Sequence, residues 1–154
     1  MYNITMYGQI EMNRGDSFKA PLFINCGDKA NPIQYELTES DVIYFAVMEA
    51  NQRFEDAIIK KIYNIHSDKD DNNNIIIGLS PEDTYNLYTG KYYYTVKIKH
   101  QTNSNQKCSN CKDWYYTEKN EFGDTVVINT EMFNDDAPYE VYTIIPETEL
   151  WIMR

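Results

Sequence analysis

The stretch LSPEDTYNLYTGKYYYTVKIKH, residues 79–100, constrains the fold of this chain more than any other. Aromatic and aliphatic side chains occupy one face of its second half: Tyr92, Tyr94, Val96 and Ile98. The opposite face carries mainly polar side chains: Lys91, Tyr93, Thr95, Lys97 and Lys99. A period of two residues is that of a β-strand with one face buried and the other in water. We therefore expect a long amphipathic strand here, with its lysines solvated.

A helical turn is predicted immediately before this strand. Ser80 can cap a helix, Pro81 suits the first helical position, and Asp83 has the spacing of a capping-box acid. The glycine at position 90 then separates the turn from the strand. We expect one short helical turn, over 81–87, and no other helix.

The rest of the chain carries short strand patterns divided by turns. The segment 42–48 is apolar throughout, which is typical of a central strand covered on both faces. Residues 4–12 and 18–24 alternate on either side of a glycine turn and are placed to form a hairpin, with Pro21 at an edge or a bulge. Further strands are predicted at 33–37, 57–65, 75–79, 113–117 and 125–130. Short strands divided by turns are the pattern of a β-sandwich, and the 14 tyrosines fit a pleated surface.

The charge of the chain limits its partners. Lys and Arg number 14 against 24 for Asp and Glu, which gives a formal net charge of −10. Such a surface repels phosphate backbones, so we expect no binding to free nucleic acid. No apolar run approaches the roughly 20 residues that span a bilayer, so we expect no membrane partner. The first residues do not resemble a secretory signal, and we expect synthesis in a cytoplasm.

The three cysteines, Cys26, Cys108 and Cys111, do not suggest a disulfide framework, because their number is odd. Cys108 and Cys111 have the spacing of half a zinc site, which needs four ligands. One interpretation is a zinc site shared between subunits, with His100 close in sequence. The favoured one is a pair of free thiols in a polar surface loop, and we therefore predict no metal and no cofactor.

Other motifs have structural explanations that we favour. The polar segment 66–74 resembles a calcium loop in composition but lacks its glycine and its closing acid, so a solvated loop is predicted. Arg14, Gly15 and Asp16 spell a cell-adhesion tripeptide, yet glycine and aspartate equally suit a tight turn.

No catalytic machinery is apparent. His66 and His100 fall at strand–loop junctions with no serine or cysteine in a nucleophile context. There is no glycine-rich phosphate loop, and no two carboxylates can be argued to face one substrate. We predict no catalytic residues and expect that the protein is not an enzyme.

The last part of the chain, 131–154, is predicted to be an extension of a domain formed by 1–130. Asn134 to Pro138 interrupts the pattern, and the chain ends in an apolar cluster that must be covered. It either adds a strand to its own sandwich or docks on a neighbour. Trp114 fits a core or an interface equally well. The candidate interface residues are Trp114, Tyr116, Leu150, Trp151, Ile152 and Met153. Deletion of 150–154 is expected to prevent assembly and leave a folded monomer.

Several motifs follow one another in a definite order within residues 1–130. They are Arg14-Gly15-Asp16-Ser17 after the first strand, Leu37-Thr38 before the strand at 42–48, Leu79-Ser80-Pro81-Glu82-Asp83-Thr84 with Leu87, and Gly90-Lys91-Tyr92-Tyr93-Tyr94-Thr95-Val96. In this order they resemble the immunoglobulin-like amino-terminal module of tailed-phage baseplate and tail proteins. Those proteins are upper-baseplate adaptors that hold receptor-binding proteins.

The resemblance implies a fold and a function. The fold would be an all-β, immunoglobulin-like antiparallel sandwich. The protein would be a bacteriophage virion structural protein made in the host cytoplasm. It would serve as an assembly or adaptor module of the tail or baseplate, or of the neck or capsid surface. Its partners would be other virion proteins and copies of itself, and the family supplies no catalytic residues. Family members often continue into a long fibre or adaptor region, which this sequence does not include, and the loop around Cys108 looks like an insertion.

Two other functions remain open at this point. A sandwich rich in tyrosine also suits a module that binds carbohydrate or a cell-surface receptor. A small hydrolase is disfavoured, because no site for it can be assembled from the sequence.

Overall fold

The computed structural model describes residues 2–4, 8–27, 30–101, 115–119, 121–123, 125–129 and 139–154. Within these ranges the chain forms twelve strands, one short α-helix and one 3-10 turn. The strands are β1 (Tyr2–Ile4), β2 (Ile10–Asn13), β3 (Phe18–Pro21), β4 (Asn25–Gly27), β5 (Pro32–Gln34), β6 (Asp41–Met48), β7 (Ile59–Tyr63), β8 (Ile76–Leu79), β9 (Gly90–Gln101), β10 (Tyr115–Lys119), β11 (Thr125–Asn129) and β12 (Tyr139–Met153). The helical elements are η1 (Phe54–Asp56) and α1 (Pro81–Tyr85). The predicted all-β class is confirmed.

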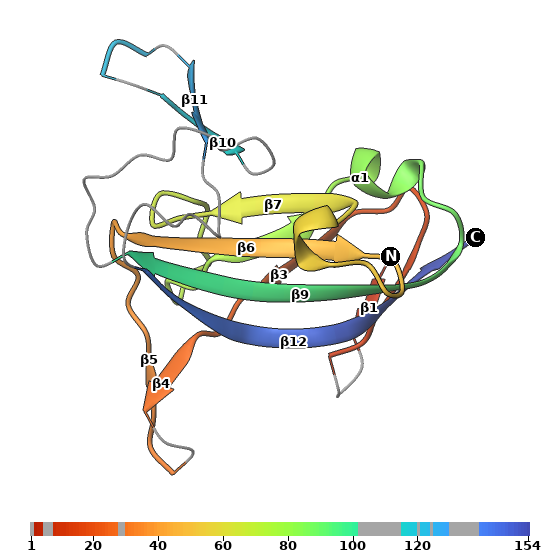
Figure 1. The fold of residues 1–154 in the computed structure, drawn as a ribbon, viewed down its shortest axis with the longest axis horizontal. Helices are drawn as coiled ribbons and strands as arrows, with labels where there is room; N and C mark the ends of the chain where they lie inside the picture. The colour runs from red at the N-terminus through yellow and green to blue at the C-terminus, as the bar shows by residue number, and fades with distance from the viewer. Residues whose placement is uncertain are drawn as a thin grey trace.

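One large sheet dominates the molecule (Figure 1). Its six strands lie in the order β1-β2-β12-β9-β6-β7, and the remaining strands pair in twos, as β3-β8, β4-β5 and β10-β11. Neighbouring strands are antiparallel except β2 and β12, which run parallel. The expectation of a wholly antiparallel fold is therefore wrong at this pair. No tight turn joins β2 to β12, so their relative direction is not imposed by a hairpin.

The main core lies between the large sheet and the β3–β8 pair. Ile10, Met12, Phe45, Val96 and Leu150 on the large sheet are essentially inaccessible to solvent. From the other layer, Phe18, Ile77 and Leu79 join the same cluster. In Figure 1, β3 runs behind β6 and β9. Two layers of strands thus bury their alternating side chains against each other.

The strand β6 is an interior strand of the large sheet and is covered on both faces, as predicted. It lies between β9 and β7 and is buried at every position except Val42, which is half-buried. Its second face carries Tyr44, Ala46 and Met48, which pack with Phe54 of η1 in a separate apolar cluster. Both faces of the strand are therefore covered.

The helical turn and the long strand also form where they are predicted, although α1 ends at Tyr85 and not at residue 87, and η1 is a further helical turn that the sequence pattern did not predict. The Asp83 N–H donates to Ser80 Oγ (3.3 Å), and the Ser80 N–H donates to Asp83 Oδ2 (2.7 Å), which completes the capping box. The strand β9 buries its apolar face. Its polar face is less exposed than expected, because Thr95 and Lys99 are 2% and 1% accessible. Lys99 pairs with Val42 on one side and Val141 on the other, which belong to the second apolar cluster.

The N-terminal prediction is wrong. The predicted strand over 4–12 is not continuous: β1 and β2 pair with each other in antiparallel register, and Gly8 has a φ of +82°. The expected hairpin with 18–24 is also absent from the described residues. There β2 pairs with β12, whereas β3 pairs with β8. The two segments cover the core from opposite layers, which a hairpin would prevent.

The end of the chain belongs to the large sheet. The strand β12 lies between β2 and β9, so this segment adds a strand to its own fold. Its register against β9 shifts between Thr143 and Thr148, around Pro146. At this irregularity the Thr95 hydroxyl donates to the Ile145 carbonyl (2.7 Å). A register shift of this kind is where a sheet tolerates proline.

Candidate functional site

The predicted interface residues divide between core and surface. Leu150 and Ile152 are 0% and 1% accessible and belong to the main core. The prediction that these two contact a neighbour is wrong, because their side chains face the second layer of their own chain. Trp151 and Met153, on the opposite face of β12, are 38% and 41% accessible. For them the interface remains a prediction.

The structure does not describe the side chains of the two remaining interface candidates. Trp114 lies outside the described residues. Tyr116 lies on β10, where the backbone alone is described.

Trp151 is held in a small network on the outer face of the sheet. Its indole N–H donates to Glu149 (3.0 Å). Lys91 Nζ lies 5.9 Å from the centre of the indole ring and 3.9 Å from the Glu149 carboxylate. The side chain is therefore fixed by neighbours on β9 and β12 while part of it stays in solvent.

The candidate metal ligands do not form a site among the residues that the structure describes. Cys108 and Cys111 lie outside the described residues, and the Cys26 side chain is not described either. Among the described residues, no three His, Cys, Asp or Glu side chains come together as a metal site. The Asp70 carboxylate accepts the N–H groups of Asn72 (3.0 Å) and Asn74 (2.8 Å). Those backbone hydrogen bonds, that of Asn74 first, lower the pKa of Asp70.

The RGD sequence is part of a turn, as the favoured interpretation has it. Gly15 has a φ of +86°, which glycine adopts without strain. The Gly15 N–H donates to Thr84 Oγ1 (3.0 Å), and that hydroxyl donates to the Asp16 carbonyl (3.1 Å). The buried Thr84 thus ties the turn to α1, and the turn leads from one layer to the other instead of closing a hairpin.

Sequence reasoning missed a buried carboxylate, Asp41, and the hydrogen-bonded cluster around it. Asp41, at the start of β6, is 1% accessible. One of its oxygens lies 2.6 Å from His100 Nδ1. The other accepts the Thr38 N–H (2.8 Å) and the Tyr35 hydroxyl (2.8 Å). Asp41 and His100 are direct partners in the β6–β9 register, and only that register brings them together.

This cluster does not have the geometry of a nucleophilic triad. Ser40 Oγ lies 3.4 Å from His100 Nδ1, the same nitrogen that faces Asp41. In a triad the carboxylate and the nucleophile occupy opposite ring nitrogens, so that one orients the imidazole while the other transfers a proton. The arrangement fits an anchor for the 35–41 segment. The other histidine, His66, pairs with Glu39 (3.1 Å) at the exposed surface.

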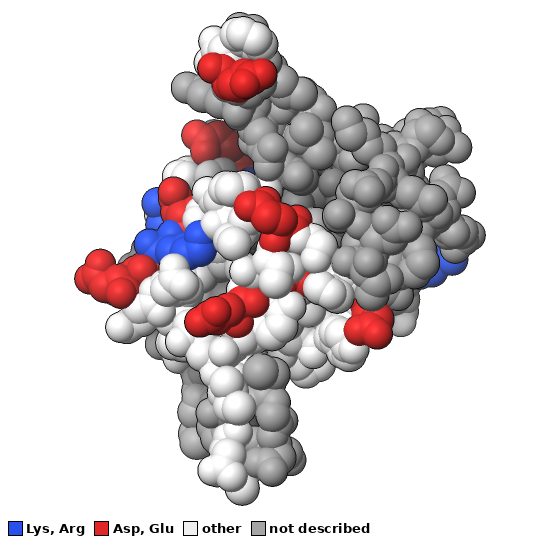
Figure 2. Space-filling view, turned by 90° about the vertical axis from the view of Figure 1, so that its left-hand side faces the viewer, with Lys and Arg blue, Asp and Glu red and all other residues white. Residues whose placement is uncertain are grey.

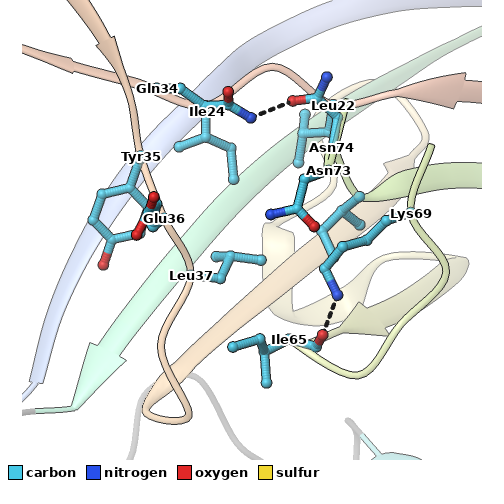
Figure 3. Close-up of a pocket in the computed structure, with 11 residues that line it drawn as sticks. Leu22, Ile24, Gln34, Tyr35, Glu36, Leu37, Ile65, Lys69, Asn73 and Asn74 are labelled. Carbon is cyan, nitrogen blue, oxygen red and sulfur yellow. Dashed lines mark hydrogen bonds between the residues drawn. The ribbon is translucent and has the colours of Figure 1, made fainter. Parts of the chain in front are cut away.

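Two hollows deserve comparison as binding sites. The first, of about 550 Å³, has an apolar floor that includes Leu22, Ile24 and Leu37 (Figure 3). Two hydrogen bonds lie within its lining: Gln34 donates to Asn74 Oδ1 (3.0 Å), and the Lys69 ammonium donates to the Ile65 carbonyl. These contacts join the walls of the hollow and engage the only ammonium group among its described lining residues.

The second hollow, of about 680 Å³, lies between the large sheet and the segment that follows β3. We call it the β12 groove, and its lining is Phe23, Ile24, Asn25, Tyr35, Ile98, His100, Glu140, Tyr142, Thr143 and Ile144. Phe23 and Tyr142 are 64% and 57% accessible, which is high for aromatic side chains. The Tyr142 hydroxyl donates to Glu140 (2.8 Å). The groove therefore combines an apolar floor, two exposed aromatic rings and a carboxylate.

The described surface at one end of the molecule carries mainly acidic charge. Figure 2 views the end of the molecule where β9 ends and β12 begins, and on its described part acidic side chains are spread widely while basic ones are few. Across the described residues, no helix combines the length and the apolarity that crossing a bilayer requires.

Fold and site together define an all-β protein of two packed layers with a groove at one end. No family model, no curated protein and no solved structure matches this chain.

Proposed function

We propose that this protein is a structural protein of a tailed-phage particle, with an immunoglobulin-like sandwich that docks on neighbouring subunits. It acts as an assembly or adaptor module of the tail or baseplate, with the neck and the capsid surface as alternative positions. Its partners are other virion proteins and copies of itself. No catalytic role and no cofactor is part of this proposal.

The observation that carries the proposal is the strand order. In variable-type immunoglobulin domains, strands G, F, C and C′ lie side by side, and B pairs with E in the other layer. Here β12, β9, β6 and β7 have the first arrangement, and β3 and β8 have the second. Along the chain the six strands also follow one another as B, C, C′, E, F and G do.

The motifs of the phage module fall on matching elements. The helical turn α1 connects β8 to β9, at the position between strands E and F. The GKYYYTV sequence begins β9, the equivalent of strand F, and places Tyr92, Tyr94 and Val96 in the core. These agreements support the resemblance. The function is inferred from the resemblance and not from the fold, because one fold serves many functions.

An assembly role agrees with the physical properties of the chain. A net charge of −10 favours solubility of the free subunit before assembly. In a symmetric particle, many copies of one weak contact act together, so the assembly is held more tightly than a single contact would hold it.

The test is the composition of purified particles. The phage that encodes this protein would be banded on a density gradient and its proteins quantified by mass spectrometry. We expect the protein in particles at a fixed ratio to the tail or capsid subunits. Its absence from infectious, gradient-purified particles would contradict the proposal.

A carbohydrate- or receptor-binding module is the second candidate. The exposed rings of Phe23 and Tyr142, beside Asn25 and His100, are the observation that favours it. Aromatic faces pack on sugar rings, and amide and imidazole groups bond to hydroxyls. Binding of the purified protein to a glycan array, lost in Tyr142→Ala, would favour this candidate.

A further inference from the structure

In the part of the chain that the structure describes, one stretch of β12 has no strand along one of its backbone edges. The strand pairs with β9 along its length, but β2 pairs only with its last residues, Leu150–Met153. Over 139–145, before Pro146, no described strand lies on the side away from β9. A β-strand directs alternate N–H and C=O groups to each side, so among the described residues no strand pairs with the donors and acceptors of this edge.

The β12 groove lies directly beside this edge. Glu140, Tyr142 and Ile144 alternate along β12 and all line the groove, as side chains on one face of a strand do. A strand added at the edge would send every second side chain into the same hollow. Those side chains would meet the apolar floor of Ile98 and Ile24 and cover the exposed rings of Phe23 and Tyr142.

The charges favour one kind of occupant. Among the described side chains that line the groove, Glu140 supplies a carboxylate, and none is a lysine or an arginine. His100 faces the buried Asp41 carboxylate from the same region. A second copy of this chain would bring its own net charge of −10, which disfavours it as the occupant of this groove, and contacts between copies would use other surfaces. A segment with lysines or arginines is attracted instead.

We propose that the edge over 139–145 and the β12 groove form a strand-addition site for an extended, basic segment of a neighbouring protein. Backbone hydrogen bonds to β12 supply affinity, and apolar side chains at alternate positions fill the groove and supply specificity. The segment belongs to a different protein of the assembly, so this inference rests on the proposed function. A sugar would contact the aromatic rings but would not complete the edge.

Hydrogen exchange measured by mass spectrometry tests the site in the protein as it exists. We expect the amides of 139–145 to exchange at least about tenfold more slowly in particles than in the free protein. If the protein is present in particles and these amides exchange as in the free subunit, strand addition is wrong and the assembly role stands. If the protein is absent from particles, the assembly role is wrong, and a peptide experiment decides strand addition separately.

The peptide experiment uses a synthetic peptide of alternating lysine and valine and the isotope-labelled protein. We expect chemical-shift changes and slowed amide exchange confined to 139–145 and the groove. The matched control is the same peptide with alternate backbone nitrogens methylated, which cannot pair as a strand. Equal binding of the methylated peptide, or no binding of the first peptide at millimolar concentration, would overturn the proposal.

Two variants separate the groove from the general acidity of the surface. Tyr142→Ala should weaken peptide binding by at least about tenfold, because it removes a ring that the apolar side chains of the peptide are to cover and leaves the charge of the groove unchanged. Tyr88→Ala alters a tyrosine that is 84% exposed in the segment between α1 and β9, away from the residues that line the groove, and should leave binding unchanged. If Tyr142→Ala does not fold, Phe23→Ala changes another ring of the groove at a 64% exposed position. Equal losses in the groove and control variants would contradict a site at the groove.

Discussion

At the scale of single residues, the buried carboxylate of Asp41 holds together segments that are distant in sequence. It binds Thr38 and Tyr35 before β6 and His100 at the end of β9. A buried charge is tolerated in a protein only when such partners replace the water that it has lost. The cluster therefore joins the loop before β6 to the neighbouring strand β9.

Replacing this carboxylate should destabilise the protein markedly. Asp41→Ala leaves the Thr38 N–H and the Tyr35 hydroxyl without their acceptor and should cost about 3 kcal/mol. Urea unfolding followed by circular dichroism measures the change. The control Asp71→Ala, at an exposed loop position, should change stability by less than about 0.5 kcal/mol. A loss at Asp41 as small as that of the control would contradict the anchoring role.

Asp83 gives a prediction about pH. Burial acts to raise the pKa of this carboxyl, but the ion pair with Lys61 (2.9 Å) and the Ser80 N–H outweigh it, and the pKa is lowered. A folded-state pKa below that of the unfolded chain means that the stabilisation is complete above the unfolded value. It is lost as the pH falls through the folded value.

Asp83→Asn should therefore cost about 1 kcal/mol at pH 7, and the difference from the wild type should shrink below about pH 4. Urea unfolding at a series of pH values measures this. Glu82→Gln, at an exposed position in the same turn, is the control. A difference between wild type and Asp83→Asn that is independent of pH would show that the charge of Asp83 is not responsible.

At the scale of elements, the β3–β8 pair depends on the absence of a side chain at one position. A Cβ on Gly78 would lie 2.2 Å from the Phe18 carbonyl oxygen, well inside contact distance. The Gly78 N–H also donates to the Tyr63 hydroxyl (3.1 Å) on β7, which links the pair to the large sheet. Burial is the main cause of the raised pKa of Tyr63. The layers are thus joined by close backbone contact as well as by apolar packing.

Gly78→Ala should force this strand pair apart and destabilise the protein by about 1–3 kcal/mol. The control Lys19→Ala changes the direct partner of Gly78 in the register without adding atoms, and it should have little effect. Thermal unfolding of both variants measures the difference. A Gly78→Ala protein as stable as the control would mean that β3 and β8 are not so closely paired.

At the scale of the whole molecule, β12 is a structural part of the fold and not an appendage. Its final residues pair with β2 and place Leu150 and Ile152 in the main core, while Trp151 and Met153 stay partly exposed. The expectation that 150–154 can be removed from a folded monomer is therefore no longer tenable. Any contact that β12 makes with a neighbouring protein has to use the outer face or the edge of this strand.

Deletion of 150–154 should now unfold the protein or nearly so. Removing one fully buried leucine or isoleucine side chain costs about 2–5 kcal/mol, and domains have only about 5–15 kcal/mol in total. Trp151→Ala, which changes only the partly exposed face, should retain the fold. Circular dichroism and urea unfolding of both variants measure this, and a cooperatively folded deletion protein would contradict the position of β12.

The sequence by itself determined the local elements. The period of two residues defined β9, the continuous apolar run defined β6, and the Ser80–Asp83 spacing defined the capped start of α1. Each of these depends on residues within a few positions of one another, so the sequence displays them directly. The all-β class follows from their sum.

Only the tertiary structure decided which strands became neighbours. Four features depend on segments that are distant in sequence. They are the parallel pairing of β2 with β12, the contact of Asp41 with His100, the burial of Lys99 and the β12 groove. Closing a long loop costs little more free energy than closing a shorter one, so chain distance does not select among such pairings. The selection comes from covering the apolar faces of all the strands at once, and that condition cannot be evaluated on any one segment.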